Sequence, residues 1–203
     1  MKGIVIELEK EALNEQASVE SLLCKAYLVA RKLKLEEFEE WINNEQNGYK
    51  GNALDYRMIN GEYKAWNPYR GWIPVILSPK LGEVASRIPL NQSVSALREI
   101  YTSHENSIQF TLNTKMNALL NQSTDGFETR FVFETSRSEI YRILSTVRNK
   151  ILERALFLEE NEIIGEGMTF TDEEKKKAQE IKIINNYTNN FYSDVSDIEM
   201  KQG

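Results

Sequence analysis

Apolar residues recur at the spacing of a helix along the first quarter of the chain. Over residues 4–15 they lie three to four positions apart with acidic residues between them, which predicts a short amphipathic helix. Residues 19–33 follow, with a serine available as a cap, and so much of this segment is apolar that we expect its helix at the centre of a bundle. A third amphipathic helix over 35–47 ends before Gly48, because glycine readily takes the left-handed conformation that follows a last helical turn.

Short alternating runs replace the helical pattern after Gly48. Asn60-Gly61 separates two of these runs, and Asn-Gly is the pair best suited to a two-residue turn, so we predict an antiparallel hairpin over 56–67. The next stretch, WNPYRGW, is interpreted as an irregular aromatic connection, and residues 73–77 as a further extended piece.

Helical spacing returns in the second half of the chain. Two modest helices are predicted over 79–87 and 94–102, and residues 104–136 favour a strand, a turn or two of helix and a second strand. The strongest periodicity keeps one apolar face from 138 to 160. We therefore predict an α+β fold that is mainly helical, with its core around this long C-terminal helix and with one small antiparallel β-hairpin.

A pair of glycines in GEGMTF ends the long helix. Thr171 and Glu174 then have the spacing of a capping box, which predicts a short charged helix. We expect residues 1–180 to form one helical domain. Residues 181–203 are rich in Asn and Ser and contain few apolar groups, so we expect this tail to be extended or to take part in self-association.

Composition narrows the classes of function. The 203-residue chain carries a formal charge of −6, which argues against a surface devoted to nucleic acid. Its single cysteine, Cys24, excludes an internal disulfide, and its single histidine, His104, limits histidine-based metal sites and Ser-His or Cys-His catalysis. No run approaches the roughly 20 apolar residues of a membrane span, and the acidic start is unlike a signal peptide. We therefore expect a cytoplasmic protein without a cofactor, a metal site or a recognisable catalytic set.

The aromatic stretch contains the first candidate binding site. Trp66, Tyr69, Arg70 and Trp72 could stack on a nucleobase, since aromatic rings and guanidinium groups present flat faces. Rings of this size are more often used for burial. The favoured interpretation is therefore a scaffold, in which these rings cap the helical core beneath the predicted hairpin and the prolines fix the backbone.

Arg137, Tyr141 and Arg148 form the second candidate, at positions i, i+4 and i+11. If the long helix starts early enough, they share one stripe at the edge of its apolar face, where they could hold a phosphate or a nucleotide. The favoured alternative is structural, because arginines at a core edge usually lay their stems on apolar surface and pair with glutamates of neighbouring helices.

Three separated blocks resemble one known family. The segments WINNEQNGY, KAWNPYRGWIPV and RNKILERALFLEENEIIGEGMTFTDEEK, in this order and spacing, are similar to the AbiTii domain of bacterial abortive-infection proteins. The resemblance runs from about Glu7 to Lys177. It implies a role in defence against bacteriophage, and it implies no accepted set of catalytic residues.

Two mechanisms are compatible with this resemblance. We expect a defence module that acts by sensing, self-assembly or partner binding, as a homo-oligomer or with a protein partner. The alternative is a toxin enzyme that acts on nucleic acid or on a nucleotide through surface arginines, and nucleic acid is the less favoured partner because of the acidic balance of the chain.

Overall fold

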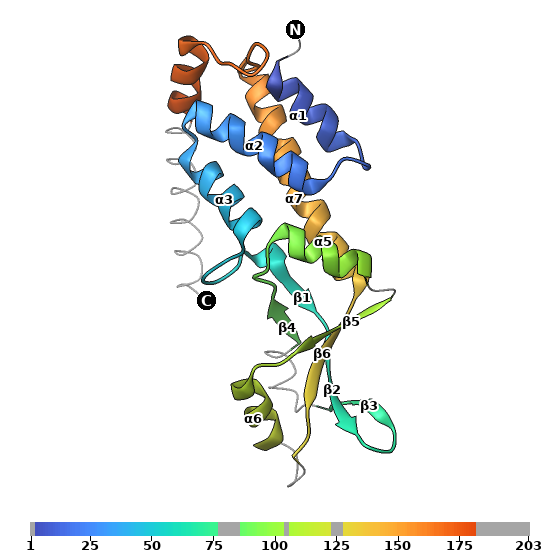
Figure 1. Ribbon diagram of the computed structural model, residues 1–203. Coiled ribbons are helices and arrows are strands. Elements are labelled where there is room, and N and C mark those ends of the chain that lie inside the picture. Colours follow the sequence, from blue (N-terminus) through green and yellow to red (C-terminus); the bar gives the residue numbers. More distant parts are fainter. Residues whose placement is uncertain (1–2, 77–85, 104–105, 123–127, 182–203) are drawn as a thin grey trace, which may run out of the picture. The chain divides into compact units, whose positions relative to one another are not determined.

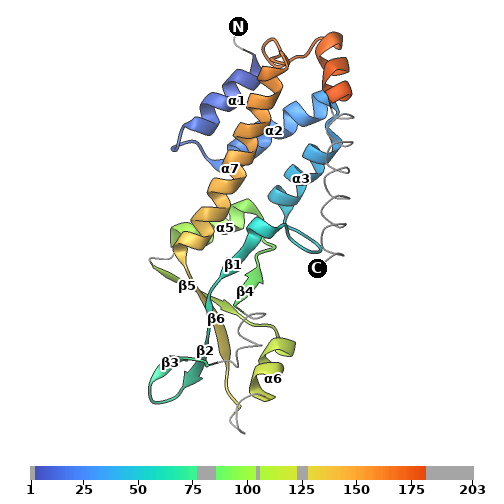
Figure 2. The same ribbon diagram turned by 180° about the vertical axis from the view of Figure 1, so that it is seen from behind.

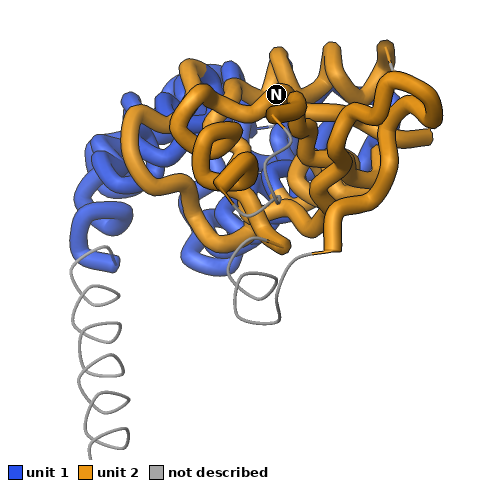
Figure 3. Tube along the Cα trace, turned by 90° about the horizontal axis from the view of Figure 1, so that it is seen from below, with its two compact units in different colours: residues 1–46, 147–203 blue, residues 47–146 orange. Residues whose placement is uncertain are grey.

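The computed structural model shows a mainly helical α+β protein (Figure 1). It describes residues 3–76, 86–103, 106–122 and 128–181. The chain forms two compact units, coloured separately in Figure 3. Unit 1 comprises the described residues up to Gln46 and from Val147 onward, and unit 2 comprises those from Asn47 to Thr146. Unit 1 is thus assembled from two segments that are far apart in the sequence.

Unit 1 is a bundle of helices. It contains α1 (Ile4–Leu13), α2 (Val19–Leu33), α3 (Glu36–Asn47) up to Gln46, α7 (Arg137–Glu160) from Val147 onward, and a helix over 172–181. In this unit α2 crosses α7, with α1 on one side and α3 on the other (Figures 1 and 2). The predicted helices over 4–15, 19–33, 35–47 and 138–160 are confirmed, although α1 ends at Leu13.

α2 contributes a wide apolar face to the centre of this bundle, while Ser21, Cys24 and Arg31 on its other side are exposed. The α2 side chains with the least exposure are Leu22, Leu23, Ala26, Val29, Ala30 and Leu33. Val147, Ile151 and Ala155 of α7 are completely buried as well. Because a buried Leu, Ile or Val side chain contributes about 1.5–3 kcal/mol, these helices are held mainly by burial. The Ser18 side chain caps α2 by accepting a hydrogen bond from the Ser21 N–H at 3.0 Å.

One carboxylate fixes the loop that follows α7. Glu174 accepts hydrogen bonds from the backbone N–H groups of Gly165 (2.7 Å), Thr171 (2.8 Å) and Ile164 (3.0 Å). Its own N–H donates to Thr171 Oγ1 at 3.2 Å, so the predicted capping box is confirmed. Burial raises the pKa of Glu174, but the hydrogen bonds from Thr171, Gly165 and Ile164 outweigh burial and hold this pKa below its ordinary value.

Unit 2 contains two antiparallel sheets. The smaller one pairs β1 (Met58–Asn60) with β4 (Arg87–Pro89). The larger one has the order β3 (Gly71–Pro74), β2 (Glu62–Asn67), β6 (Phe131–Ser136) and β5 (Ser107–Thr111). The unit also holds a 3-10 turn (Asp55–Arg57), α5 (Val94–Ser103), α6 (Thr114–Gln122) and the start of α7. The helix predicted over 94–102 and the strand, helix and strand predicted within 104–136 are confirmed.

One face of the larger sheet is a core face. Strand register places Tyr63 opposite Phe133 and Ala65 opposite Phe131. The Tyr63 and Phe133 rings meet edge to face at 5.2 Å, and both side chains are buried, which raises the pKa of the Tyr63 hydroxyl. Successive strand residues point to opposite faces, so the next residue along β2, Lys64, lies on the other face of the sheet.

The hairpin predicted at Asn60-Gly61 is wrong in position. β1 ends at Asn60 and β2 begins at Glu62, but β1 pairs with β4, and β2 pairs with β3 and β6. Gly61 serves a close approach, because a Cβ there would lie 2.4 Å from the Glu134 carbonyl oxygen and 2.5 Å from the Phe133 ring. The hairpin of the fold is β2–β3, so WNPYRGW forms its turn and is not an irregular connection.

The predicted fold class is confirmed: a mainly helical α+β protein with a long helix near its C-terminal end and an antiparallel hairpin. Most of the helix predicted over 79–87 lies outside the described residues, and its last residue, Arg87, begins β4. The tail predicted over 181–203 lies outside them too, except for Ile181, which is helical and is the last described residue. The domain boundary at 180 therefore stays a prediction.

Candidate functional site

The turn of the β2–β3 hairpin is closed by the side chain of Asn67. Its Oδ1 accepts hydrogen bonds from the backbone N–H groups of Tyr69 (2.9 Å) and Arg70 (3.1 Å). The Asn67 carbonyl accepts a further bond from the Arg70 N–H at 3.3 Å. Gly71 then takes a φ of 73°, a backbone conformation that residues other than glycine rarely adopt. Asn followed by Pro at the start of a turn is a favoured pairing, so this turn had a local signal in the sequence.

Two tryptophans face each other where the hairpin strands meet the turn. Trp66 and Trp72 are register partners, and their rings make an edge contact with centroids 5.3 Å apart. The backbone of Trp66 is fixed on its other side, because its N–H donates to the Arg130 carbonyl at 2.9 Å and its carbonyl accepts from Thr129 Oγ1 at 2.7 Å. The two strand residues next to the turn, Trp66 and Trp72, are thus held by strand pairing, and Trp66 also by hydrogen bonds to the neighbouring segment.

The end of this hairpin presents its largest side chains to solvent. We call Trp66, Tyr69, Arg70 and Trp72 the hairpin tip. Tyr69 is 96% exposed and Trp66 is 38% exposed, and Arg70 is exposed as well. The prediction that these rings cap a helical core is wrong for Tyr69, which lies in the turn and is almost fully exposed, while Trp66 and Trp72 are partly exposed and contact each other. The rings form a raised and ordered aromatic surface instead.

Arg137 and Tyr141 come together around an aromatic residue that the sequence did not single out. The Arg137 guanidinium lies over the Tyr101 ring, with its Cζ 4.0 Å from the centroid, and the Tyr101 and Tyr141 rings are 5.8 Å apart. Tyr141 is 55% exposed. Helical spacing could not reveal this stack, because Tyr101 belongs to α5, which is distant in the sequence. A guanidinium over a ring contributes about 0.5–2 kcal/mol, so part of the role of Arg137 is structural.

Arg148 has different surroundings from the other two members of the predicted stripe. In unit 1 its guanidinium donates to the carbonyl oxygens of Asn14 (2.9 Å), Glu11 (3.3 Å) and Ala12 (3.3 Å), and also to that of Ala17. These groups end α1 and form the connection to α2. Arg148 therefore organises a helix end, and its hydrogen bonds here go to backbone carbonyls where we expected a glutamate.

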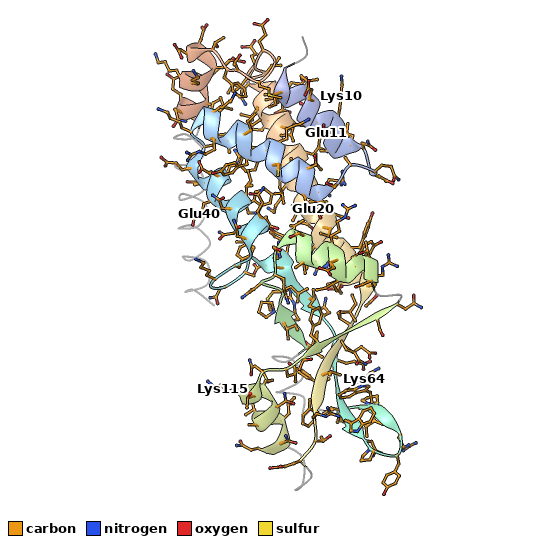
Figure 4. All side chains as sticks on the ribbon, viewed as in Figure 1. Lys10, Glu11, Glu20, Glu40, Lys64 and Lys115 are labelled. Carbon is orange, nitrogen blue, oxygen red and sulfur yellow. The ribbon has the colours of Figure 1, made fainter. Side chains whose placement is uncertain are left out.

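Two glutamates of unit 2 line a polar hollow of about 470 Å³ beside Asn60. Glu134 pairs with Lys64, which Figure 4 labels on β2, and accepts from Gln109 at 2.7 Å. Glu139 accepts from the Asn60 N–H at 3.1 Å and from the Arg142 guanidinium at 3.0 Å.

Burial raises the pKa of Glu134 and of Glu139, but these donors outweigh burial and leave both pKa values below the ordinary range. The donors to Glu134 come from the neighbouring strands β2 and β5, and those to Glu139 come from Asn60 of β1 and from Arg142 of α7 itself, so both carboxylates have structural partners. Over the described ranges, no three His, Cys, Asp or Glu side chains gather as they would around a metal ion.

Comparison with known proteins gives one positive result. The family model described as AbiTii matches residues 3–183. The search of curated proteins and the search of solved structures returned no match. Within the part of the chain that the structure describes, none of the helices combines the length and the apolar character needed to cross a membrane.

Proposed function

Because the chain belongs to the AbiTii family of abortive-infection proteins, we propose that it contributes to bacteriophage defence by binding a protein, either a partner or a second copy of itself, and not by catalysis. The hairpin tip is the surface assigned to this contact. Binding of the partner at the hairpin tip during infection would be the event that activates the defence.

The exposure of Tyr69 at a fixed turn is the observation that carries the proposal. An aromatic ring that is 96% exposed gives up nearly all of its contact with water only when a partner covers it. Trp, Tyr and Arg are the residue types that dominate binding energy at protein interfaces, and the hairpin tip consists of these types alone. The two hydrogen bonds to Asn67 Oδ1 order the turn beforehand, which lowers the entropic cost of binding.

The charges around the hairpin favour a protein over a nucleic acid as the partner. Nucleic-acid affinity depends on several Lys or Arg side chains that neutralise phosphates. Arg70 is the one basic residue of the hairpin tip, Lys64 on β2 is paired with Glu134, and the whole chain carries −6. These features support a contact made by rings with a single guanidinium at its edge.

The alternative function, a toxin enzyme acting on a nucleotide or nucleic acid, receives less support from the same residues. Arg148 donates to four backbone carbonyls and Arg137 lies over the Tyr101 ring, so both arginines have internal roles. Salt-sensitive nuclease or nucleotide hydrolysis by the purified protein that Arg70→Ala abolishes would establish the alternative and exclude the proposal.

Site-specific photocross-linking tests the proposal. A photoreactive phenylalanine analogue replaces Tyr69 in one variant and Leu13 in a matched control, since Leu13 is also an exposed apolar side chain, at 70%. In bacteria infected with a phage that the protein restricts, we expect a cross-linked protein adduct at position 69 and none at position 13. A second copy of the chain would give an adduct of twice the 23.5 kDa chain mass. Adducts to nucleic acid alone, or equal protein adducts at both positions, would contradict the proposal.

A further inference from the structure

Unit 1 carries a groove between α3 and α7 that shares no residue with the hairpin tip or with the polar hollow of unit 2. Its volume is about 340 Å³, at the lower end of the range of small-molecule sites. The groove is lined by Glu37, Phe38 and Trp41 from α3 and by Lys150, Glu153, Arg154 and Phe157 from α7. Aromatic rings and charged groups of both signs thus meet in one recess.

Flat faces dominate the floor of this groove. The Phe38 and Trp41 rings are stacked with centroids 5.6 Å apart and planes only 7° from parallel. The Arg154 guanidinium lies 5.2 Å from the centroid of Phe38 and 5.8 Å from that of Phe157. Three rings and a guanidinium thereby lie against one another, which is an arrangement suited to a planar ligand.

Arg154 lacks an anion in these surroundings. Across the described ranges its guanidinium makes no hydrogen bond and has no carboxylate within 4.0 Å, and it lies over the Phe38 and Phe157 rings. Burial lowers the pKa of Arg154, and the more distant charge of Glu37 opposes this effect only in part. A half-buried cation without an acceptor is costly, so an anion that reaches it from the groove gains more than it would at an exposed arginine.

We propose that this groove binds a nucleotide, with its base against Trp41 and its phosphate at Arg154 and Lys150. The two acidic residues of the rim complete the recognition, because carboxylates accept hydrogen bonds from ring N–H and amino groups. Glu37 and Glu153 also disfavour a bare inorganic anion, which would meet their negative charge without offering them a donor. The site would give unit 1 a sensing role that is independent of the hairpin tip in unit 2.

Trp41 provides a direct readout of this site. The chain has three tryptophans, so Trp66→Phe with Trp72→Phe leaves Trp41 as the single tryptophan, which is excited selectively over the tyrosines. The four ribonucleoside 5′-monophosphates are titrated into this protein, in parallel with the matching nucleosides and with inorganic phosphate. We expect at least one nucleotide to quench Trp41 with a Kd of about 1 mM or tighter, and its nucleoside and inorganic phosphate to bind at least about tenfold more weakly.

A second set of variants assigns the binding to Arg154. Arg154→Met keeps much of the side-chain length and removes the charge, and we expect it to weaken nucleotide binding by about tenfold or more. Arg31→Met is the matched control, because Arg31 is a largely exposed arginine of unit 1 whose ion pair with Glu39 lies outside the groove lining. It is expected to leave binding unchanged.

Three results would overturn the proposal. No quenching by any nucleotide does so even if Arg154→Met fails to fold, because that titration needs no change at Arg154. Equal binding by inorganic phosphate excludes base recognition. A shift of Trp41 emission that depends on protein concentration alone, and that Arg154→Met abolishes, assigns the groove to a second copy of the chain.

Discussion

Arg148 acts on the residues that end α1. The last carbonyl oxygens of a helix have no partner within it, and Arg148 supplies donors to those of Glu11 and Ala12 and to those of Asn14 and Ala17 beyond. Removing the guanidinium takes one donor from each of these four carbonyls, although those of Glu11 and Asn14 still accept from the backbone N–H groups of Asn14 and Ala17. We expect Arg148→Ala to lower the free energy of unfolding by about 2–3 kcal/mol, measured by urea denaturation.

Arg70→Ala is the control for that measurement, since its exposed side chain makes no comparable contacts and its removal should change stability by less than about 0.5 kcal/mol. Equal midpoints for the two variants would show that the carbonyl contacts contribute nothing. The position of Arg148 on the helix was evident from the sequence, but its acceptors lie more than a hundred residues away, so spacing along α7 could not identify them.

Glu9 and Glu159 place two carboxyl groups next to each other in unit 1. Burial raises the pKa of Glu9 above its ordinary 4.5, the charge of Glu159 raises it further, and Lys10 opposes both effects weakly. Oε1 of Glu9 is buried and has no hydrogen-bond partner among the residues that the structure describes. Folding therefore makes Glu9 easier to protonate than it is in the unfolded chain, and its ionised form is repelled by Glu159.

The expected pH dependence follows from the sign of this shift. A raised pKa in the folded state means that the stabilising contribution is complete below 4.5 and is lost as the pH rises through the folded value. We expect Glu9→Gln to melt at a higher temperature than the native chain at pH 7, and the difference to disappear near about pH 4. Glu15→Gln, an exposed position, is the control. A Glu9→Gln protein that melts lower at neutral pH would contradict this assignment.

Among the secondary-structure elements, Gly61 connects β1 of the smaller sheet to β2 of the larger sheet. Its N–H donates to the Ser86 carbonyl at 3.1 Å, and a Cβ would strike the Glu134 carbonyl of β6. We expect Gly61→Ala to destabilise the protein by about 1–3 kcal/mol, because the clash is with backbone and not with a flexible side chain. Thermal melting followed by circular dichroism measures this change.

Gly51→Ala is the matched control, since no atom of the described segments lies within 4 Å of a Cβ at that position. Its expected effect is neutral or slightly stabilising, because alanine restricts the unfolded chain. If both substitutions had the same effect, the close approach of β2 to β6 would not explain the glycine.

Elements whose signals are local were predictable, and strand partners were not. The capping box at Thr171 and Glu174 and the serine cap of α2 involve groups three residues apart, so the sequence contains both partners. Asn60-Gly61 carried an equally clear turn signal, but pairing with β4, β3 and β6 overrode it. Strand pairing depends on side chains distant in sequence, and residue spacing alone does not describe it.

The division into two units belongs to the scale of the whole molecule. The helices of unit 1 come from the N-terminal segment up to Gln46 and from the segment that starts at Val147, and unit 2 is formed by the residues between these segments. Periodicity predicted the helices of unit 1 one by one, since an apolar face is visible within each segment. It could not reveal the groove of α3 and α7, because Trp41 and Arg154 share that groove only through tertiary packing.

The hairpin tip lies on unit 2 and the groove lies on unit 1, so the two proposed binding roles can be removed separately. The family relation supplies the biological setting, which is defence against bacteriophage. Binding of a protein by the exposed rings of the hairpin tip is the proposed mechanism of that defence. We therefore expect a substitution at the hairpin tip to abolish defence without affecting the fold, because Tyr69 and Arg70 contribute little burial.

The efficiency of plating of a restricted phage on bacteria expressing the Tyr69→Ala, Arg70→Ala double variant tests this account most directly. Leu13→Ala serves as the control, and circular dichroism establishes that all proteins are folded. We predict that plating on the double variant rises to the level of bacteria without the protein, while Leu13→Ala restricts the phage as the native chain does. Full restriction by a folded double variant would contradict the account.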